Sequence, residues 1–127
     1  MRGVRSAADR KRAYRRGLRA EALALVFLMA KGYRPLARRY GGKGGEIDLI
    51  VRRGNAVVFV EVKARGELDR AAEAISPMTQ RVFGRAAAHW LVRNPWAASC
   101  DLRADAVLVA PWRLPRHIVM AFDLEIG

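Results

Sequence analysis

Two apolar segments separated by only three residues constrain the fold of this chain more than any other feature. Residues 46–52 and 56–64 are rich in Val, Ile and Phe, and Arg53, Gly54 and Asn55 lie between them. Such segments are typical of β-strands. A link this short permits only an antiparallel hairpin, because a parallel crossover needs a dozen or more residues. The second segment is apolar on both faces at residues 57–60, which indicates a strand that is covered on both sides.

The remaining segments predict helices on either side of this hairpin. Residues 18–31 are rich in Ala and Leu and end at Gly32, a suitable helix C-cap. Residues 33–40 are interpreted as a short extended or loop segment. The later expectations are helices over 68–75 and from Ser76-Pro77 to about Arg93, then strands over 104–110 and 117–122. This order predicts an α/β (mixed α+β) domain, with a central mixed sheet of about four strands flanked by helices.

The charge of the chain is strongly positive, which favours a polyanionic partner. In 127 residues there are 24 Lys and Arg and 12 Asp and Glu, for a net charge of +12. Nucleic acid is the first partner to consider and anionic lipid the second. Residues 1–16 are interpreted as a disordered basic tail or as an arm that grips phosphates, and the two interpretations are compatible. Residues 17–127 are then one domain.

Several classes of protein are disfavoured by the composition. The single cysteine, Cys100, excludes an intramolecular disulfide and a multi-cysteine zinc site, and it fits a cytoplasmic location. The apolar residues 22–30 are too few for a membrane span and lack a signal-cleavage site. Residues 41–45 are rich in glycine but lack the Lys-Ser/Thr ending of a phosphate-binding loop. His89 and Trp90 are expected to pack, or to extend a polar tip to solvent, rather than to ligate a metal, and His117 carries no stronger signal.

Two carboxylates lie in the apolar segments of the hairpin. Asp48 follows Ile47 in the first segment, and Glu61 follows Val60 in the second. An unpaired carboxylate in a low-dielectric site costs several kcal/mol, so each needs a partner or a function. With a two-residue loop Asp48 would lie directly opposite Glu61, and with the loop shifted by one residue it would lie diagonally on the same face. Only a three-residue loop without a bulge would separate them.

Two interpretations of this pair remain open. A cluster of carboxylate oxygens without thiolate or imidazole selects a hard ion, Mg²⁺ or Mn²⁺. Lys63, two residues after Glu61, would then lie beside the ion, where it could position a water and stabilise charge on a phosphate. Alternatively, Glu61 and Lys63 form a structural ion pair and Asp48 pairs with an arginine.

The hairpin motifs also resemble those of a known family. Gly-Gly-Glu-Ile-Asp-Leu-Ile (residues 44–50) followed by Phe-Val-Glu-Val-Lys-Ala-Arg (residues 59–65) is similar to the YraN-like family of uncharacterised bacterial proteins. That family resembles the PD-(D/E)XK nuclease superfamily, near the Holliday-junction resolvase-like branch. The similarity extends over residues 17–123. The further matching positions are Gly17, Glu21, Leu28, Gly32, Gln80, Arg103, Asp105, Ala121 and Phe122, while Thr79 and Ala104 depart from the family pattern.

The resemblance implies a restriction-endonuclease-like fold with a metal site. Asp48, Glu61 and the carbonyl of Val62 would ligate the Mg²⁺ or Mn²⁺, and Lys63 would be catalytic. Glu21 would be a further acid delivered from the first helix, or a polar residue at the rim of that helix. Glu46 is a weaker candidate. Nucleic acid is expected to contact Gln80, Arg81, Arg65, Arg15 and Arg16.

These observations lead to a functional expectation with an alternative. The expected function is that of a metal-dependent endonuclease that acts on DNA, including structured or branched DNA. Resolvase-like relatives imply a homodimer. The alternative is a non-catalytic nucleic-acid-binding protein with a vestigial nuclease site, or an interaction protein whose basic tail contacts RNA, the ribosome or an anionic membrane. No membrane span is expected in either case.

Overall fold

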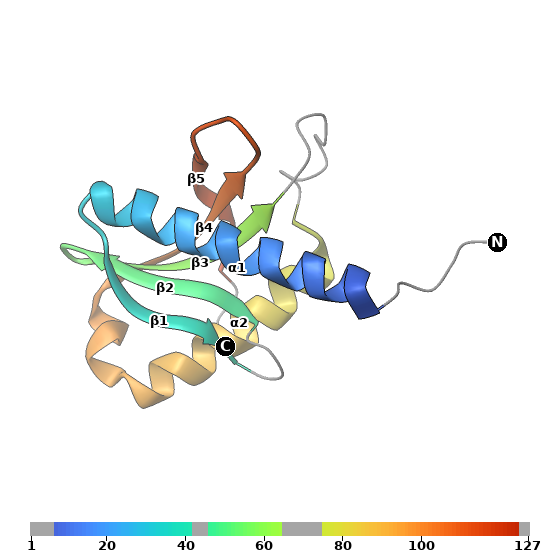
Figure 1. Ribbon diagram of the computed structural model, residues 1–127. Coiled ribbons are helices and arrows are strands. Elements are labelled where there is room, and N and C mark those ends of the chain that lie inside the picture. The colour runs from blue at the N-terminus through green and yellow to red at the C-terminus, as the bar shows by residue number, and fades with distance from the viewer. Residues whose placement is uncertain (1–6, 42–45, 65–74, 125–127) are drawn as a thin grey trace.

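The computed structural model describes residues 7–41, 46–64 and 75–124 (Figure 1). Within these residues, helices pack against a mixed β-sheet. The elements in chain order are α1 (Ala7–Ala30), β1 (Arg34–Tyr40), β2 (Ile47–Arg53), β3 (Ala56–Ala64), α2 (Pro77–Arg93), the short 3-10 helix η2 (Pro95–Ser99), β4 (Asp101–Val109) and β5 (Arg116–Phe122). No helix of the described ranges is long and apolar enough to cross a membrane.

The sheet has five strands in the order β1-β2-β3-β4-β5. The central neighbours β3 and β4 are parallel, and the other neighbouring strands are antiparallel. The predicted mixed sheet is therefore confirmed, with one strand more than expected. The additional strand is β1, which the sequence did not distinguish from a loop. It is an edge strand, where Pro35 is tolerated because its missing N–H removes no essential ladder bond. Its exposed arginines also hide the alternation of apolar residues.

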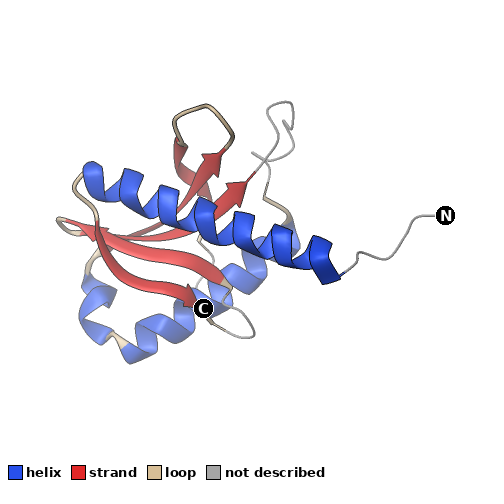
Figure 2. Ribbon diagram, viewed as in Figure 1, coloured by secondary structure: helices blue, strands red, loops and turns tan. Residues whose placement is uncertain are grey.

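The two long helices cover opposite faces of the sheet (Figure 2). Each face buries its own apolar cluster, and burial of apolar surface is the main driving force for such layered packing. The cluster under α1 consists of Ala20, Ala24, Leu28, Tyr33, Leu49, Val51, Val58, Val60, Val107 and Val109. The cluster under α2 consists of Ile47, Ile50, Val57, Phe59, Phe83, Ala86, Ala87, Trp90, Ala97 and Ala104.

The β2–β3 hairpin has the two-residue loop that was expected to place Asp48 directly opposite Glu61. Arg53 pairs with Ala56, so the loop consists of Gly54 and Asn55 alone. Gly54 has a φ of 59°, a left-handed conformation that favours glycine. Because side chains alternate along a strand, this loop determines which residues of β2 and β3 share a face.

The helix boundaries agree with the sequence in part. At the start of α2 the hydroxyl of Ser76 accepts the backbone N–H of Thr79 at 3.1 Å, and Pro77 is the first helical residue, as expected. By contrast, α1 begins at Ala7 rather than near residue 18, so part of the segment interpreted as a tail is helical. The helix expected over 68–75 lies outside the described residues except for Ile75, which is not helical.

Candidate active site

The end of the β2–β3 hairpin brings two acidic side chains together. The strand pairing reaches Leu49 opposite Val60, and one step further along the same register lie Asp48 and Glu61. There the backbone N–H of Val62 donates to Oδ2 of Asp48 at 2.8 Å. The two acids that the sequence analysis selected are therefore neighbours in the fold.

The electrostatics of Asp48 are unfavourable to its ionised form. Burial and the negative charge of Glu61 raise the pKa of the Asp48 carboxyl from 3.8 to about 7. The charge of Glu21 raises this pKa further, while the hydrogen bond from Val62 lowers it in part. An arginine partner would have lowered the pKa instead. Burial and the neighbouring acids thus favour the protonated form of Asp48.

Lys63 is on the same strand as Glu61, and it lies beside the two acids. Its ammonium is 3.0 Å from Oε2 of Glu61, and the side chains of Lys63 and Glu61 are 24% and 12% exposed. The ion pair considered as a structural alternative is therefore present. It does not remove Lys63 from the site, because an ammonium has three donors and this one is partly open to solvent.

Glu21 approaches the site from α1 but is held by β1. Its Oε1 accepts a hydrogen bond from Nε of Arg39 at 2.8 Å, and a guanidinium nitrogen of Arg38 lies 3.9 Å from the same oxygen. Arg39 has a φ of 48°, in the left-handed region that few non-glycine residues adopt. Glu21 influences the charge state of Asp48, yet its own carboxylate is engaged by the edge strand.

The donor set determines which metal the site could hold. Within residues 7–41, 46–64 and 75–124, no three acidic, histidine or cysteine side chains converge in a metal-binding arrangement. Asp48 and Glu61 converge as a pair of carboxylates. Mg²⁺ is commonly held by one or two carboxylates and keeps several waters, whereas a zinc site needs more protein ligands. The residues present therefore fit a hard, hydrated divalent cation.

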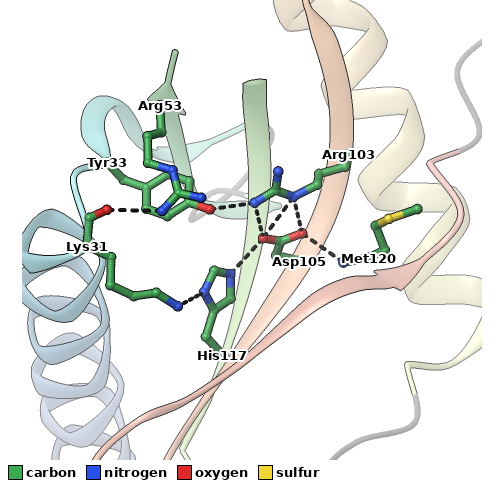
Figure 3. A network of polar contacts seen from close by, with 7 residues as sticks. All are labelled: Lys31, Tyr33, Arg53, Arg103, Asp105, His117 and Met120. Carbon is green, nitrogen blue, oxygen red and sulfur yellow. Dashed lines mark hydrogen bonds and ion pairs between the residues drawn. The ribbon is translucent and has the colours of Figure 1, made fainter. Parts of the chain in front are cut away.

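A second buried acid, Asp105 on β4, lies on the other side of β3 and is neutralised by its surroundings (Figure 3). It is fully buried and accepts hydrogen bonds from Nε of Arg103 at 3.0 Å and from the backbone N–H of Met120 at 3.0 Å. Nε2 of His117 lies 2.7 Å from its other oxygen. Burial alone would raise the pKa of Asp105, but the hydrogen bonds from His117, Arg103 and Met120 together lower it.

The same network connects four parts of the chain that are distant in sequence. Nζ of Lys31, at the end of α1, lies 2.6 Å from Nδ1 of His117 on β5. A terminal nitrogen of Arg103 donates to the hydroxyl of Tyr33 at 2.5 Å, and the guanidinium of Arg53 lies 4.5 Å from the centre of the Tyr33 ring. The contacts bind the C-terminal end of α1 to the sheet (Figure 3).

The sequence analysis missed the role of His117 in this network. The available signal was Asp105, which lies between two alanines in an apolar strand. Like Asp48, Asp105 interrupts an apolar strand, and an acid in such a place needs a partner or a function. The partner could not be found in the same way, since the sequence does not show that β5 lies against β4.

Comparison with known proteins shows the family of the chain. Residues 20–109 match the family described as "Uncharacterised protein family UPF0102". The chain belongs to the UPF0102 family. A UPF0102 protein of Methylobacterium nodulans is 62% identical over 120 residues, which cover 94% of this chain and 93% of the relative. UPF0102 proteins of Methylorubrum extorquens and Methylocella silvestris are 59% and 48% identical, over 93% and 98% of this chain and 92% and 100% of their own lengths.

The nucleic-acid contacts expected in this UPF0102 chain have different places in the fold. The side-chain amide of Gln80 donates to the carbonyl of Ile75 at 2.8 Å, at the start of α2, and Arg81 is exposed on the same helix. Arg15 and Arg16 fall within α1, and Arg65 lies outside the described residues. Contact of Gln80 and these four arginines with nucleic acid stays a prediction. Glu46, the weaker candidate acid of the carboxylate site, is exposed just before β2.

Proposed function

We propose that this UPF0102 chain is a divalent-metal-dependent nuclease that hydrolyses phosphodiester bonds in DNA. The observation that carries the proposal is that Asp48 and Glu61 are neighbours, where burial and the charge of Glu61 raise the pKa of Asp48 to about 7. Two like charges on directly opposed residues of neighbouring strands repel. A bound cation would turn that repulsion into attraction, and strongly shifted pKa values are typical of functional sites.

The residues of the site would divide the work of hydrolysis. Bound Mg²⁺ or Mn²⁺ would supply Lewis acidity toward the phosphate and a water of lowered pKa. Asp48 and Glu61 would hold the ion, and the N–H of Val62 would fix the orientation of the Asp48 carboxylate. The ammonium of Lys63, already placed beside Glu61, would donate to phosphate oxygens as negative charge develops on them.

The resemblance to resolvase-like nucleases supports DNA as the substrate, including structured or branched DNA. The net charge of +12 supports the same class of partner, because basic surfaces attract the phosphate backbone. A homodimer is a further part of this proposal, by analogy with the same relatives.

The experiment compares cleavage by the full chain and by variants in Mg²⁺ or Mn²⁺. Single-stranded, duplex, flap and four-way-junction DNA are the substrates. We expect Asp48→Asn and Glu61→Gln to lower the cleavage rate by at least about 100-fold, since each removes a charge that holds the ion. Asp101→Asn, an exposed acid at the start of β4, is the matched control and should cleave like the wild type. Absence of metal-dependent cleavage of every substrate would overturn the proposal.

Metal binding can be measured without relying on activity. A ligand that binds only the folded state raises stability by mass action. Mn²⁺ should therefore raise the melting temperature of the wild type and of Asp101→Asn, but not that of Asp48→Asn. Equal shifts in all three proteins would contradict a site at Asp48.

A second candidate function is binding of nucleic acid without catalysis. The observation in its favour is that Glu61 is already paired with Lys63 and Glu21 with Arg39, as expected of a site that has become structural. This function predicts salt-dependent DNA binding that survives Asp48→Ala. Binding of this kind, without cleavage in either metal, would favour it over the nuclease.

A further inference from the structure

A hollow of about 510 Å³ lies between the end of β1 and α2. The two elements adjoin each other at this place (Figure 1). Most of the side chains that form its walls are basic or aromatic. Those that carry the argument are Arg38, Arg39, Tyr40, Arg85, His89 and Arg93. Among the described residues, Glu46 is the one acid that lines the same hollow.

The hollow adjoins the carboxylate site through β1. The pairing of β1 with β2 sets Arg38 opposite Leu49 and Tyr40 opposite Ile47, so Arg39 falls opposite Asp48. Arg39 also holds Glu21, the acid whose charge acts on Asp48. A nucleic-acid strand bound at Asp48 and Glu61 would therefore need to cross only the edge β-strand β1 to reach the hollow.

The wall formed by α2 is suited to a chain of phosphates. Arg85, His89 and Arg93 follow one another at intervals of four residues, so they share one face of the helix. Arg85 and Arg93 are both exposed. A guanidinium binds a phosphate with two parallel hydrogen bonds and stacks on flat rings, which a lysine does not do.

The wall formed by β1 adds a flat surface. The hydroxyl of Tyr40 lies 2.6 Å from Nδ1 of His89, and the two ring centres are 5.9 Å apart at an angle of 37°. Each ring thus holds the other in place. Aromatic and histidine rings held in this way are typical platforms for unpaired bases.

We propose that this hollow binds a short unpaired stretch of nucleic acid, with phosphates on Arg85 and Arg93 and a base on the Tyr40–His89 pair. The inference rests on the proposed nuclease function and names the form of nucleic acid that would reach the carboxylate site. The volume is in the range of small-ligand sites and too small for a double helix. Charge and shape together therefore favour a single strand over a duplex.

The experiment measures binding of a short fluorescein-labelled oligothymidylate to the full chain by anisotropy, in EDTA so that no strand is cut. The double variant Arg85→Ala/Arg93→Ala should weaken binding by at least about 10-fold. It should also lower the slope of log K against log salt by about 1.4, as expected for two lost phosphate contacts on a single strand. His89→Ala should weaken binding with little change in that slope, because it removes a stacking surface rather than a charge.

The matched control is Arg19→Ala/Arg34→Ala, which removes the same charge from exposed positions outside the hollow. It should weaken binding by less than about 3-fold. Equal losses in the two double variants, no loss in either, or tighter binding of a duplex than of the single strand would each overturn the inference.

The two proposals fail in different ways. If the hollow variants lose binding but no substrate is cut in either metal, the nuclease function fails and the hollow stands. If Asp48→Asn abolishes cleavage while Arg85→Ala/Arg93→Ala binds like the wild type, the hollow fails and the nuclease function stands.

Discussion

Asp48 is half-buried and Asp105 is fully buried in the sheet, and their surroundings move their pKa values in opposite directions. Around Asp105, hydrogen bonds from His117, Arg103 and Met120 outweigh the effect of burial and lower the pKa. Around Asp48, burial and the charge of Glu61 act together and raise the pKa to about 7. The first arrangement stabilises the fold. The second costs stability and is the one expected where a cation binds.

Asp105→Asn should lower the free energy of unfolding at pH 7 by about 3 kcal/mol, because it leaves Arg103 with a poorer buried partner. The stabilisation by Asp105 is present above its ordinary pKa of 3.8 and is lost as the pH falls through its lowered folded value. The difference in the free energy of unfolding between the wild type and Asp105→Asn, measured by urea unfolding, should therefore become smaller in acid. Asp101→Asn is the control, and equal urea midpoints for wild type and Asp105→Asn at pH 7 would contradict the prediction.

Asp48→Asn should have the opposite effect in the absence of divalent metal. A raised pKa means that stability is lost as the pH rises from 3.8 through about 7, and asparagine carries no charge to bury. The variant should be more stable than the wild type near pH 8, on the order of 2 kcal/mol, and nearly equal to it near pH 4. Thermal melts in EDTA test this, with Asp123→Asn as an exposed control. A variant less stable than the wild type near pH 8 would disprove it.

At the scale of the elements, the hairpin and the edge strand contribute in different ways. The two-residue loop of the hairpin determines the register that makes Asp48 and Glu61 neighbours. The edge strand β1 then supplies Arg39, whose left-handed backbone accompanies its bond to Glu21. The hairpin could be predicted because loop length and alternation are local properties. The strand β1 could not, because an edge position depends on the rest of the sheet.

Gly54→Ala tests the contribution of the hairpin loop. A Cβ at Gly54 would meet no atom within 4 Å, so the cost comes only from its φ of 59°. We expect a loss of about 1 kcal/mol in the free energy of unfolding, with the cleavage rate unchanged, since the register is kept. Urea unfolding and the cleavage assay measure the two effects. A large loss of activity in the folded variant would show that the register had shifted.

At the scale of the whole molecule, the fold brings acids and arginines from separate segments to one end of the hairpin. The acids lie on α1, β2 and β3, and arginines of β1 and α2 line the adjoining hollow. Aromatic rings from β1 and α2 meet in the same place. Substrate class and chemistry would therefore be decided at the place where α1, β1, β2, β3 and α2 come together.

The sequence alone determined the hairpin, the candidate acids Asp48 and Glu61, the capped start of α2 and the mixed sheet. The first three depend on alternation, loop length or capping within a few residues of the chain, and the mixed sheet follows from the order of the predicted elements. Only the tertiary structure decided which partners the side chains acquired. It showed that Glu21 meets Arg39, that Asp105 meets His117, and that Tyr40 meets His89. The physical reason is that charge and burial act through space, so an acid's pKa depends on neighbours that lie far away along the chain.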